Sequence, residues 1–129
     1  MIKKYIRIIP RNKNIPPKII IKLLNYLGYE GQIVRNSELG VGGTASDLVL
    51  NICKECGADI YLSGQGGKDY LNLERFEGAE ISVEFQNYQH QEYQQCFPKA
   101  GFCKGLSIVD LLFNEGKNSL TIIENGRIE

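Results

Sequence analysis

Glycine ends each of the two clearest helical patterns in the chain, and a short apolar stretch follows each of these glycines. Apolar residues recur at helical spacing from Pro17 to Gly28, and residues 31–35 then have the pattern of a strand. A second helical pattern ends at Gly57, and residues 58–62 again resemble a strand. A helix that stops at glycine and passes into an apolar strand, twice in succession, is typical of an α/β fold.

The remaining patterns continue this alternation. The second helix is expected to follow Thr44, which can cap it with Asp47 as a capping-box partner. A short helical stretch around Phe76 precedes a strand at residues 81–85, and a final helix runs from Ser107 to Gly116. One further strand is expected within residues 2–9. We predict an α/β fold with a largely parallel sheet of three to four strands, flanked by helices and forming part of a larger α/β domain.

Charge and hydropathy exclude several classes of protein. The 129 residues include 15 basic and 15 acidic ones, so no net charge attracts nucleic acid or an anionic membrane. The apolar run at residues 6–9 is short, contains a charge and stops at Pro10, so we expect neither a signal peptide nor a membrane span. We therefore expect a cytoplasmic protein that does not bind nucleic acid.

Four cysteines in a reducing cytoplasm are expected to be thiols. Cys53 and Cys56 could form half of a zinc site with Cys96 and Cys103, or a redox pair. The first two lie on the apolar side of a predicted helix, near its C-terminus, where the helix dipole disfavours a thiolate. The spacing of the other two is wider than in zinc knuckles. We therefore expect no metal site and interpret the cysteines mainly as buried thiols.

The loop at residues 63–70 is the first candidate site, because ligands of parallel α/β sheets bind beyond the carboxyl ends of strands. Its glycines allow positive φ and close approach of backbone amides to an anion, and Lys68 adds a positive charge. The spacing before Lys68 is too short for a Walker loop, and Asp69 occupies the third glycine of a dinucleotide fingerprint. A simple tight turn is the alternative. The expected ligand-binding residues are Ser63, Gly64, Gly66, Gly67, Lys68 and Tyr70.

Two other segments are candidates. Gly42 and Gly43 also lie between a strand and a helix, and Glu38 just before them could act as a general base or bind a hydroxyl group, or could simply be a solvated acid. His90 is the sole histidine and lies in a long polar and aromatic connection at residues 86–105. It is a candidate for proton transfer or ligand contact, although a lone histidine is more often structural or exposed to solvent.

Four blocks of sequence together resemble the WbqC-like protein family. They are residues 37–40, 58–71, 88–90 and 106–114, and they occur in the family's order within residues 17–124. The resemblance implies a bacterial protein often associated with O-antigen or other surface-polysaccharide gene clusters, whose members look like enzymes that attach a small group to a sugar. Family members are longer, with an N-terminal half that this chain lacks before Pro17.

The resemblance and the residue patterns together give the predicted function. We expect residues 1–16 to be an irregular basic lead-in and residues 17–129 to be the C-terminal part of a WbqC-like domain. The expected activity is group transfer to a sugar or nucleotide-sugar, with His90, Asp69 and Glu38 as catalytic candidates; the sequence does not indicate whether a cofactor takes part. Asp69 could orient substrate hydroxyls or cap the short helix. Asp110 and Asn114 could be structural or could contact substrate.

Two alternatives remain open at this point. The chain could be a non-catalytic or degenerate domain that recognises a nucleotide-sugar or a partner protein. The partner could also be a separately encoded N-terminal half that completes the site.

Overall fold

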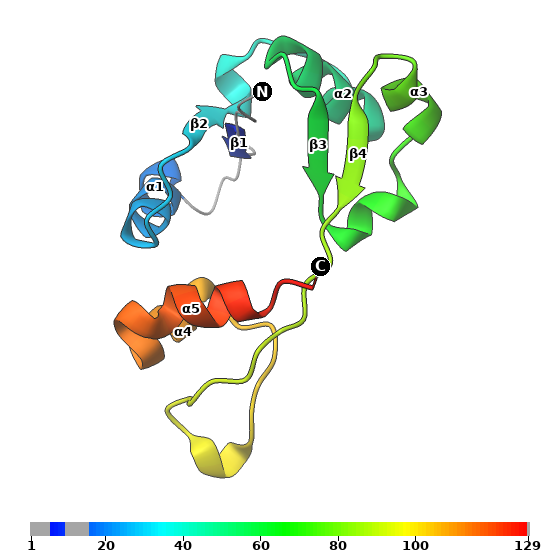
Figure 1. The fold of residues 1–129 in the computed structure, drawn as a ribbon. Helices are drawn as coiled ribbons and strands as arrows, with labels where there is room; N and C mark the ends of the chain where they lie inside the picture. The colour runs from blue at the N-terminus through cyan, green and yellow to red at the C-terminus, as the bar shows by residue number, and fades with distance from the viewer. Residues whose placement is uncertain (1–5, 10–15, 129) are drawn as a thin grey trace. The chain divides into compact units, whose positions relative to one another are not determined.

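The computed structural model describes residues 6–9 and 16–128, and it divides into two compact units at Gln86 and Asn87. The first contains β1 (Ile6–Ile9), α1 (Pro17–Tyr26), β2 (Gln32–Arg35), α2 (Ala45–Glu55), β3 (Ile60–Ser63), α3 (Leu73–Glu77) and β4 (Ser82–Phe85). The second contains α4 (Ile108–Glu115) and α5 (Ser119–Asn125), which follow a long irregular connection. Figure 1 shows these elements along the chain.

The α/β class, the parallel pairing and the flanking helices are confirmed. The four strands pair two by two: β1 is parallel to β2, and β3 is parallel to β4. Parallel neighbours need a crossover connection, and here α1 joins the first pair while a segment containing α3 joins the second. β1 lies within the stretch where one strand is expected, and the rest of the basic lead-in up to residue 15 lies outside the described residues.

The core of the first unit lies between the β3–β4 sheet and two helices. Leu50 and Cys53 of α2, Phe76 of α3, and Ile81 are buried together, and Phe76 is completely inaccessible to solvent. Tyr61 of β3 stacks on the Phe76 ring with 5.9 Å between ring centres. Burial of these side chains fixes the position of β3, and therefore of the loop that follows it.

Local capping agrees only in part with the sequence prediction. Thr44 is the N-cap residue of α2, but its side chain forms no capping hydrogen bond, and Asp47 instead forms an ion pair with Arg75. The predicted capping box is therefore wrong. Ser107 does cap α4, because its hydroxyl oxygen accepts a hydrogen bond from the Val109 amide at 3.2 Å.

The second unit closes on its own C-terminal segment. Tyr88 pairs with Arg127 in an antiparallel bridge, and the Gln89 amide donates to the Gly126 carbonyl at 2.8 Å. The buried hydroxyl of Ser119 donates to the Gly116 carbonyl at 2.7 Å, at the point where α5 begins. Neither α5 nor this pairing is among the elements predicted from the sequence.

Candidate functional site

The loop after β3 begins with a buried serine. Ser63 is only 2% exposed, and its hydroxyl donates to the Gly64 carbonyl at 3.0 Å. A 3-10 turn, Gln65–Asp69, follows it. The Gln86 amide donates to the Ser63 carbonyl at 2.7 Å, and the Gln65 side chain donates to the Gln86 carbonyl at 2.7 Å. These two bonds hold the loop at the carboxyl ends of β3 and β4.

Packing explains one of the three loop glycines. A Cβ atom on Gly67 would lie 2.0 Å from the Ser63 hydroxyl oxygen and 3.0 Å from a methyl carbon of Leu71. Gly67 is also buried, and its amide donates to the Gly64 carbonyl at 3.0 Å. A side chain at position 67 would therefore displace Ser63 or Leu71.

Packing does not explain the other two glycines of the loop, Gly64 and Gly66. A Cβ atom on Gly64 or Gly66 would meet no atom within 4 Å. None of the three glycines has a positive φ, so the left-handed backbone that glycine permits is not used in this loop. The 3-10 turn accounts for this difference, because its residues need only right-handed angles that any residue adopts. The outer side of the loop is thus open at Gly64 and Gly66.

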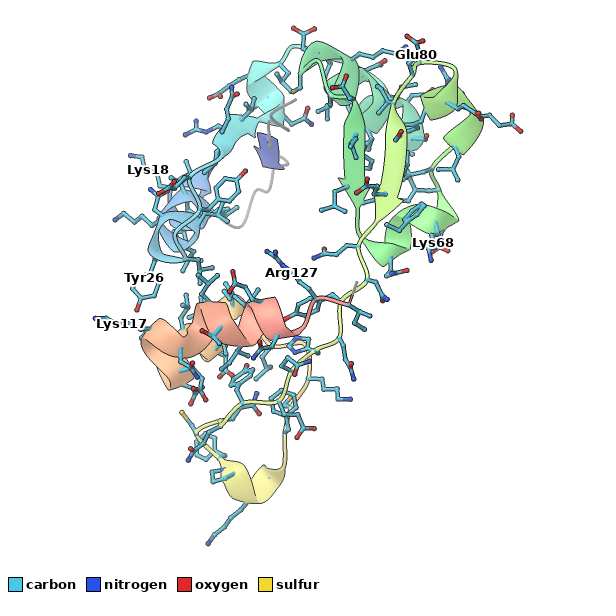
Figure 2. The ribbon with its side chains drawn as sticks, in the orientation of Figure 1. Lys18, Tyr26, Lys68, Glu80, Lys117 and Arg127 are labelled. Atoms are coloured by element: carbon cyan, nitrogen blue, oxygen red, sulfur yellow. The ribbon has the colours of Figure 1, made fainter. Side chains whose placement is uncertain are left out.

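Lys68 provides a positive charge beside this open backbone. Its ammonium nitrogen lies 5.4 Å from the centre of the Phe85 ring, which is a cation–π contact. Within the described part of the chain Lys68 forms no ion pair with a carboxylate. Figure 2 shows it at the end of the sheet opposite Glu80.

Tyr70 and Asp69 complete the loop. Tyr70 is half exposed, and it interacts with the phenol of Tyr61. Burial raises the pKa of Tyr61, the nearby Tyr70 raises it further, and the Ser63 hydroxyl lowers it. Asp69 is exposed and does not cap α3. The cap is Asn72, whose side-chain oxygen accepts from the Arg75 amide at 3.2 Å, because Asn72 is the residue directly before the helix.

The second glycine-rich segment leads into α2. Gly43 has a φ of +120°, and a Cβ atom there would lie 3.0 Å from the Leu48 amide nitrogen, so the backbone itself requires glycine. Gly42 is open at its Cβ position and accepts a hydrogen bond from the Asn51 side chain at 2.9 Å. The carboxylate of Glu38 lies 3.4 Å from the Arg35 guanidinium, and both side chains are exposed.

Two contacts connect the start of α2 with the segment after the first loop. The Asn72 amide donates to the Ser46 hydroxyl at 2.9 Å, and the Arg75 guanidinium pairs with the Asp47 carboxylate. Because α2 runs back along the sheet before β3, its N-terminus lies toward the carboxyl end of that strand. Ser46 and Asn72 were not singled out from the sequence, since a single serine or asparagine carries no signal by itself.

His90 belongs to the second unit. Its exposed ring lies edge-on to Tyr88, with 6.0 Å between centres, and tilted against Phe102 at 6.4 Å. Asp110 and Asn114 have structural contacts in the same unit. One carboxylate oxygen of Asp110 accepts from the Tyr93 hydroxyl at 2.7 Å, and the side-chain oxygen of Asn114 accepts from the Cys96 thiol at 3.3 Å. Both residues therefore hold the long connection against α4.

The cysteines are all free thiols, but only one is fully buried. Burial raises the pKa of Cys53 to about 11, and it also raises the pKa of Cys56, which is half-buried. Cys96 and Cys103 are exposed, so the interpretation as buried thiols is wrong for these two, which lie in the irregular connection rather than on a helix. Among the described residues no group of three or more histidine, cysteine or acidic side chains is placed to hold a metal ion.

These features define a small α/β protein with a glycine-rich loop and a lysine at the carboxyl ends of two parallel strands. In the residues that the structure describes, no helix has the length and apolar character needed to span a membrane.

Residues 14–122 match the WbqC-like protein family, and the chain belongs to that family. The chain is 26% identical over 100 residues to a protein of Mycobacterium tuberculosis (strain ATCC 25618 / H37Rv) named Uncharacterized protein Rv1507c. That alignment covers 77% of this chain but 42% of the relative, so the chain matches less than half of the relative's length. No solved structure matches the chain.

Proposed function

We infer that this chain carries the anion-binding part of a group-transfer enzyme that acts on a sugar or nucleotide-sugar in bacterial surface-polysaccharide biosynthesis, in the cytoplasm. The observation that carries this proposal is the open backbone at Gly64 and Gly66, where a Cβ atom would meet nothing within 4 Å. Neither packing nor a positive φ requires glycine at these positions. Another physical reason for glycine at both positions is that it lets a ligand approach the backbone closely.

The proposed ligand group is a phosphate. Backbone amides at the start of the 3-10 turn would donate to its oxygens, and the Lys68 ammonium would balance its charge. The cation–π contact with Phe85 keeps the lysine close to the loop and leaves its hydrogens available to an anion. Ser63 supports the loop from beneath rather than contacting the ligand directly, since it is buried.

The candidate catalytic side chains differ in the contacts that they already make within the protein. Glu38 is paired with Arg35, so it would have to leave that partner before acting as a base. Asp69 is an exposed residue of the loop itself and could orient a sugar hydroxyl. His90 is the candidate base that accepts the proton of the attacking group, since histidine is the side chain most often used for general acid–base catalysis. Gly42, open at its Cβ position, is a further candidate for ligand approach.

Calorimetric titration of the chain with uridine diphosphate tests the anion site. We expect saturable binding that weakens about tenfold or more in Lys68→Met, because each charge-assisted hydrogen bond contributes about 1.5–3 kcal/mol. Lys54→Met is the matched control, since Lys54 is also exposed but lies in the last turn of α2. Equal affinities for the wild type and the Lys68 variant would rule out this placement of the phosphate.

A ligand-binding domain without turnover is the second function that we propose. The chain spans 42% of the length of its M. tuberculosis relative, so groups needed for turnover could come from a separately encoded half. Binding of uridine diphosphate without transfer from any nucleotide-sugar would favour this function. Transfer activity that is lost in His90→Gln with binding retained would favour the enzyme.

A further inference from the structure

Helix α4 of the second unit carries an apolar stripe that is exposed to solvent. Leu106 lies just before the helix, and Val109 and Phe113 follow it at spacings of three and four residues, which places all three on one face. Their exposed fractions are 43%, 38% and 86%. These three residues form the α4 stripe. Large apolar side chains that are exposed together, unlike single ones, mark an interaction surface.

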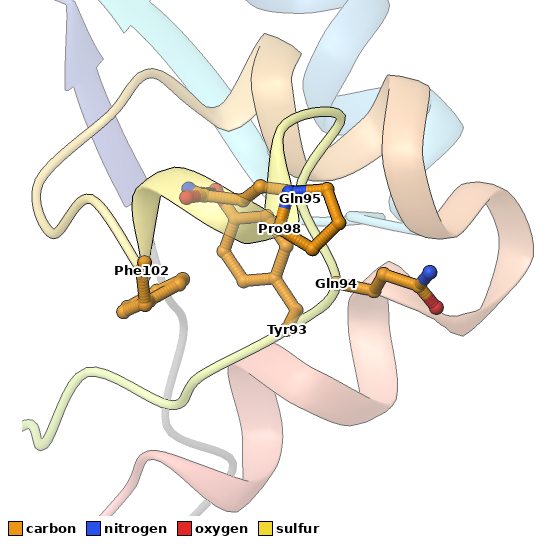
Figure 3. A pocket seen from close by; sticks show the side chains of 6 residues that line it. Tyr93, Gln94, Gln95, Pro98 and Phe102 are labelled. Carbon is orange, nitrogen blue, oxygen red and sulfur yellow. Dashed lines mark hydrogen bonds between the residues drawn. The ribbon is translucent and has the colours of Figure 1, made fainter.

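The other side of α4 faces the connection that precedes it. Leu111 is buried, and one carboxylate oxygen of Asp110 accepts from the Tyr93 hydroxyl at 2.7 Å. The Gln95 side chain donates to the same oxygen at 3.3 Å. Figure 3 shows Tyr93 and Gln95 in this connection, where both line a small pocket. Packing within the unit therefore accounts for Asp110 and Leu111, but it does not cover the α4 stripe.

The second unit has little apolar core of its own. Among its described residues, Leu111 is the one apolar side chain that is buried. A segment of this length seldom builds a stable core without disulfides, a metal or a packing partner. The cysteines are free thiols, and the described residues include no group of side chains placed to hold a metal ion. A packing partner for the α4 stripe would supply the missing apolar burial.

The charges around the α4 stripe favour an acidic partner over a second copy of the chain. Lys104 precedes the stripe and Lys117, labelled in Figure 2, follows it; both are exposed, and neither forms an ion pair within the described residues. The Glu115 carboxylate is already engaged, because it accepts from the Gln94 amide at 3.2 Å. Aligned stripes of two copies would bring lysines together at both ends, and like charges repel.

The length of the relative indicates where such a partner comes from. More than half of the M. tuberculosis protein lies outside its alignment with this chain. Interfaces between domains of one protein start at about 600 Å², whereas complexes of separate proteins typically bury about 1,600 Å². One phenylalanine and two aliphatic side chains suit the smaller class.

We propose that the α4 stripe packs against the part of a WbqC-like protein that corresponds to this unmatched portion, through an apolar surface bordered by carboxylates. The proposal applies whether that portion belongs to the same polypeptide or to a separate one. No residue of the glycine-rich loops enters the argument, so the proposal does not depend on the phosphate site.

Co-expression of the tagged chain with the unmatched portion of the M. tuberculosis relative tests this proposal. We expect the two polypeptides to co-purify in equal amounts. Hydroxyl-radical footprinting should show Phe113 and Leu106 oxidised in the chain alone and protected in the pair. Phe113→Ser should weaken the pairing about tenfold, as for the loss of a central aromatic contact. The circular dichroism of this variant alone should equal that of the wild type, because the side chain is exposed.

The matched controls lie outside the α4 stripe. Phe97 is 78% exposed and belongs to the irregular connection, so Phe97→Ser should pair as the wild type does. The double variant Lys104→Glu with Lys117→Glu should weaken the pairing several-fold at low salt. Lys99→Glu, which changes another exposed lysine of the connection, should not.

Recovery of the chain without the relative's portion, or undiminished pairing of Phe113→Ser, would overturn the proposal. Protection of Phe113 in the chain alone would also overturn it, because the stripe would then be covered by a second copy, which light scattering detects, or by another part of this chain. Uridine diphosphate titration of the Lys68 variant concerns the first unit, so failure of the phosphate site would leave these results unchanged.

Discussion

Alanine substitutions at the three glycines of the first loop should have opposite effects on stability. In Gly67→Ala the new Cβ atom would lie 2.0 Å from the Ser63 oxygen, in a buried position. Overpacking of this kind costs about 1–3 kcal/mol. In Gly64→Ala the new atom meets open space, and the backbone already has φ −68° and ψ 166°, which suit alanine. That substitution and Gly66→Ala should each stabilise the fold by about 0.4–1 kcal/mol, because alanine lowers the conformational entropy of the unfolded chain.

Urea denaturation followed by circular dichroism measures these differences, since the chain has no tryptophan to report by fluorescence. The double variant Ser63→Ala with Gly67→Ala should recover part of the loss, because the clashing oxygen is absent and the remaining Ser63 Cβ contact is 3.2 Å. A Gly67→Ala protein as stable as the wild type would refute this account of the loop. So would a Gly66→Ala protein that is destabilised as much as Gly67→Ala.

Three other predictions concern single positions. Burial raises the pKa of Cys53 from 9.0 to about 11, so the stability that its neutral thiol contributes is complete below pH 9 and is lost as the pH rises toward 11. The loss is at most about 3 kcal/mol, and denaturation of Cys53→Ala measured over the same pH range should not show this loss. Glu80 has a φ of +58°, so Glu80→Gly should raise stability by about 1 kcal/mol in thermal unfolding, whereas Glu80→Ala should not. Gly126→Ala should destabilise the second unit by about 1–3 kcal/mol, because its Cβ would lie 2.5 Å from the Tyr88 ring; unchanged amide exchange at Gln89 would contradict this.

Local patterns predicted the helices better than the pairing of the strands. The apolar spacing after Pro17 and before Gly57 identifies α1 and α2, because burial of one helix face repeats every three to four residues. Strands of four residues carry only two side chains per face, so their pattern does not specify a neighbour. That is why one sheet was expected where two pairs of strands form.

The missed helix α5 has a different cause. Its first residue, Ser119, is 1% exposed and reaches back to the carbonyl of Gly116. A buried serine at the start of a helix does not contribute to an apolar pattern, and seven residues are too few to establish a period. The pairing of Tyr88 with Arg127 is a contact across a long stretch of sequence, which no local pattern encodes.

Sequence reasoning placed the candidate loop correctly after β3 but did not distinguish its glycines. Gly67 is required by the position of the Ser63 hydroxyl, whereas the Cβ positions of Gly64 and Gly66 are open, and this difference depends on neighbours in the folded protein rather than on local sequence. The contact of Lys68 with Phe85 joins residues from two elements, so it was also beyond a reading of the sequence. The roles of His90, Asp69 and Glu38 stay predictions.

The most direct measurement is a titration of the ¹⁵N-labelled chain with uridine diphosphate, recorded amide by amide. If a phosphate binds the open backbone, the amides of residues 64–68 should shift together with one saturation curve, and the shifts should shrink in Gly66→Ala although that variant is at least as stable as the wild type. Shifts confined to other residues, or undiminished in Gly66→Ala, would contradict binding at this loop.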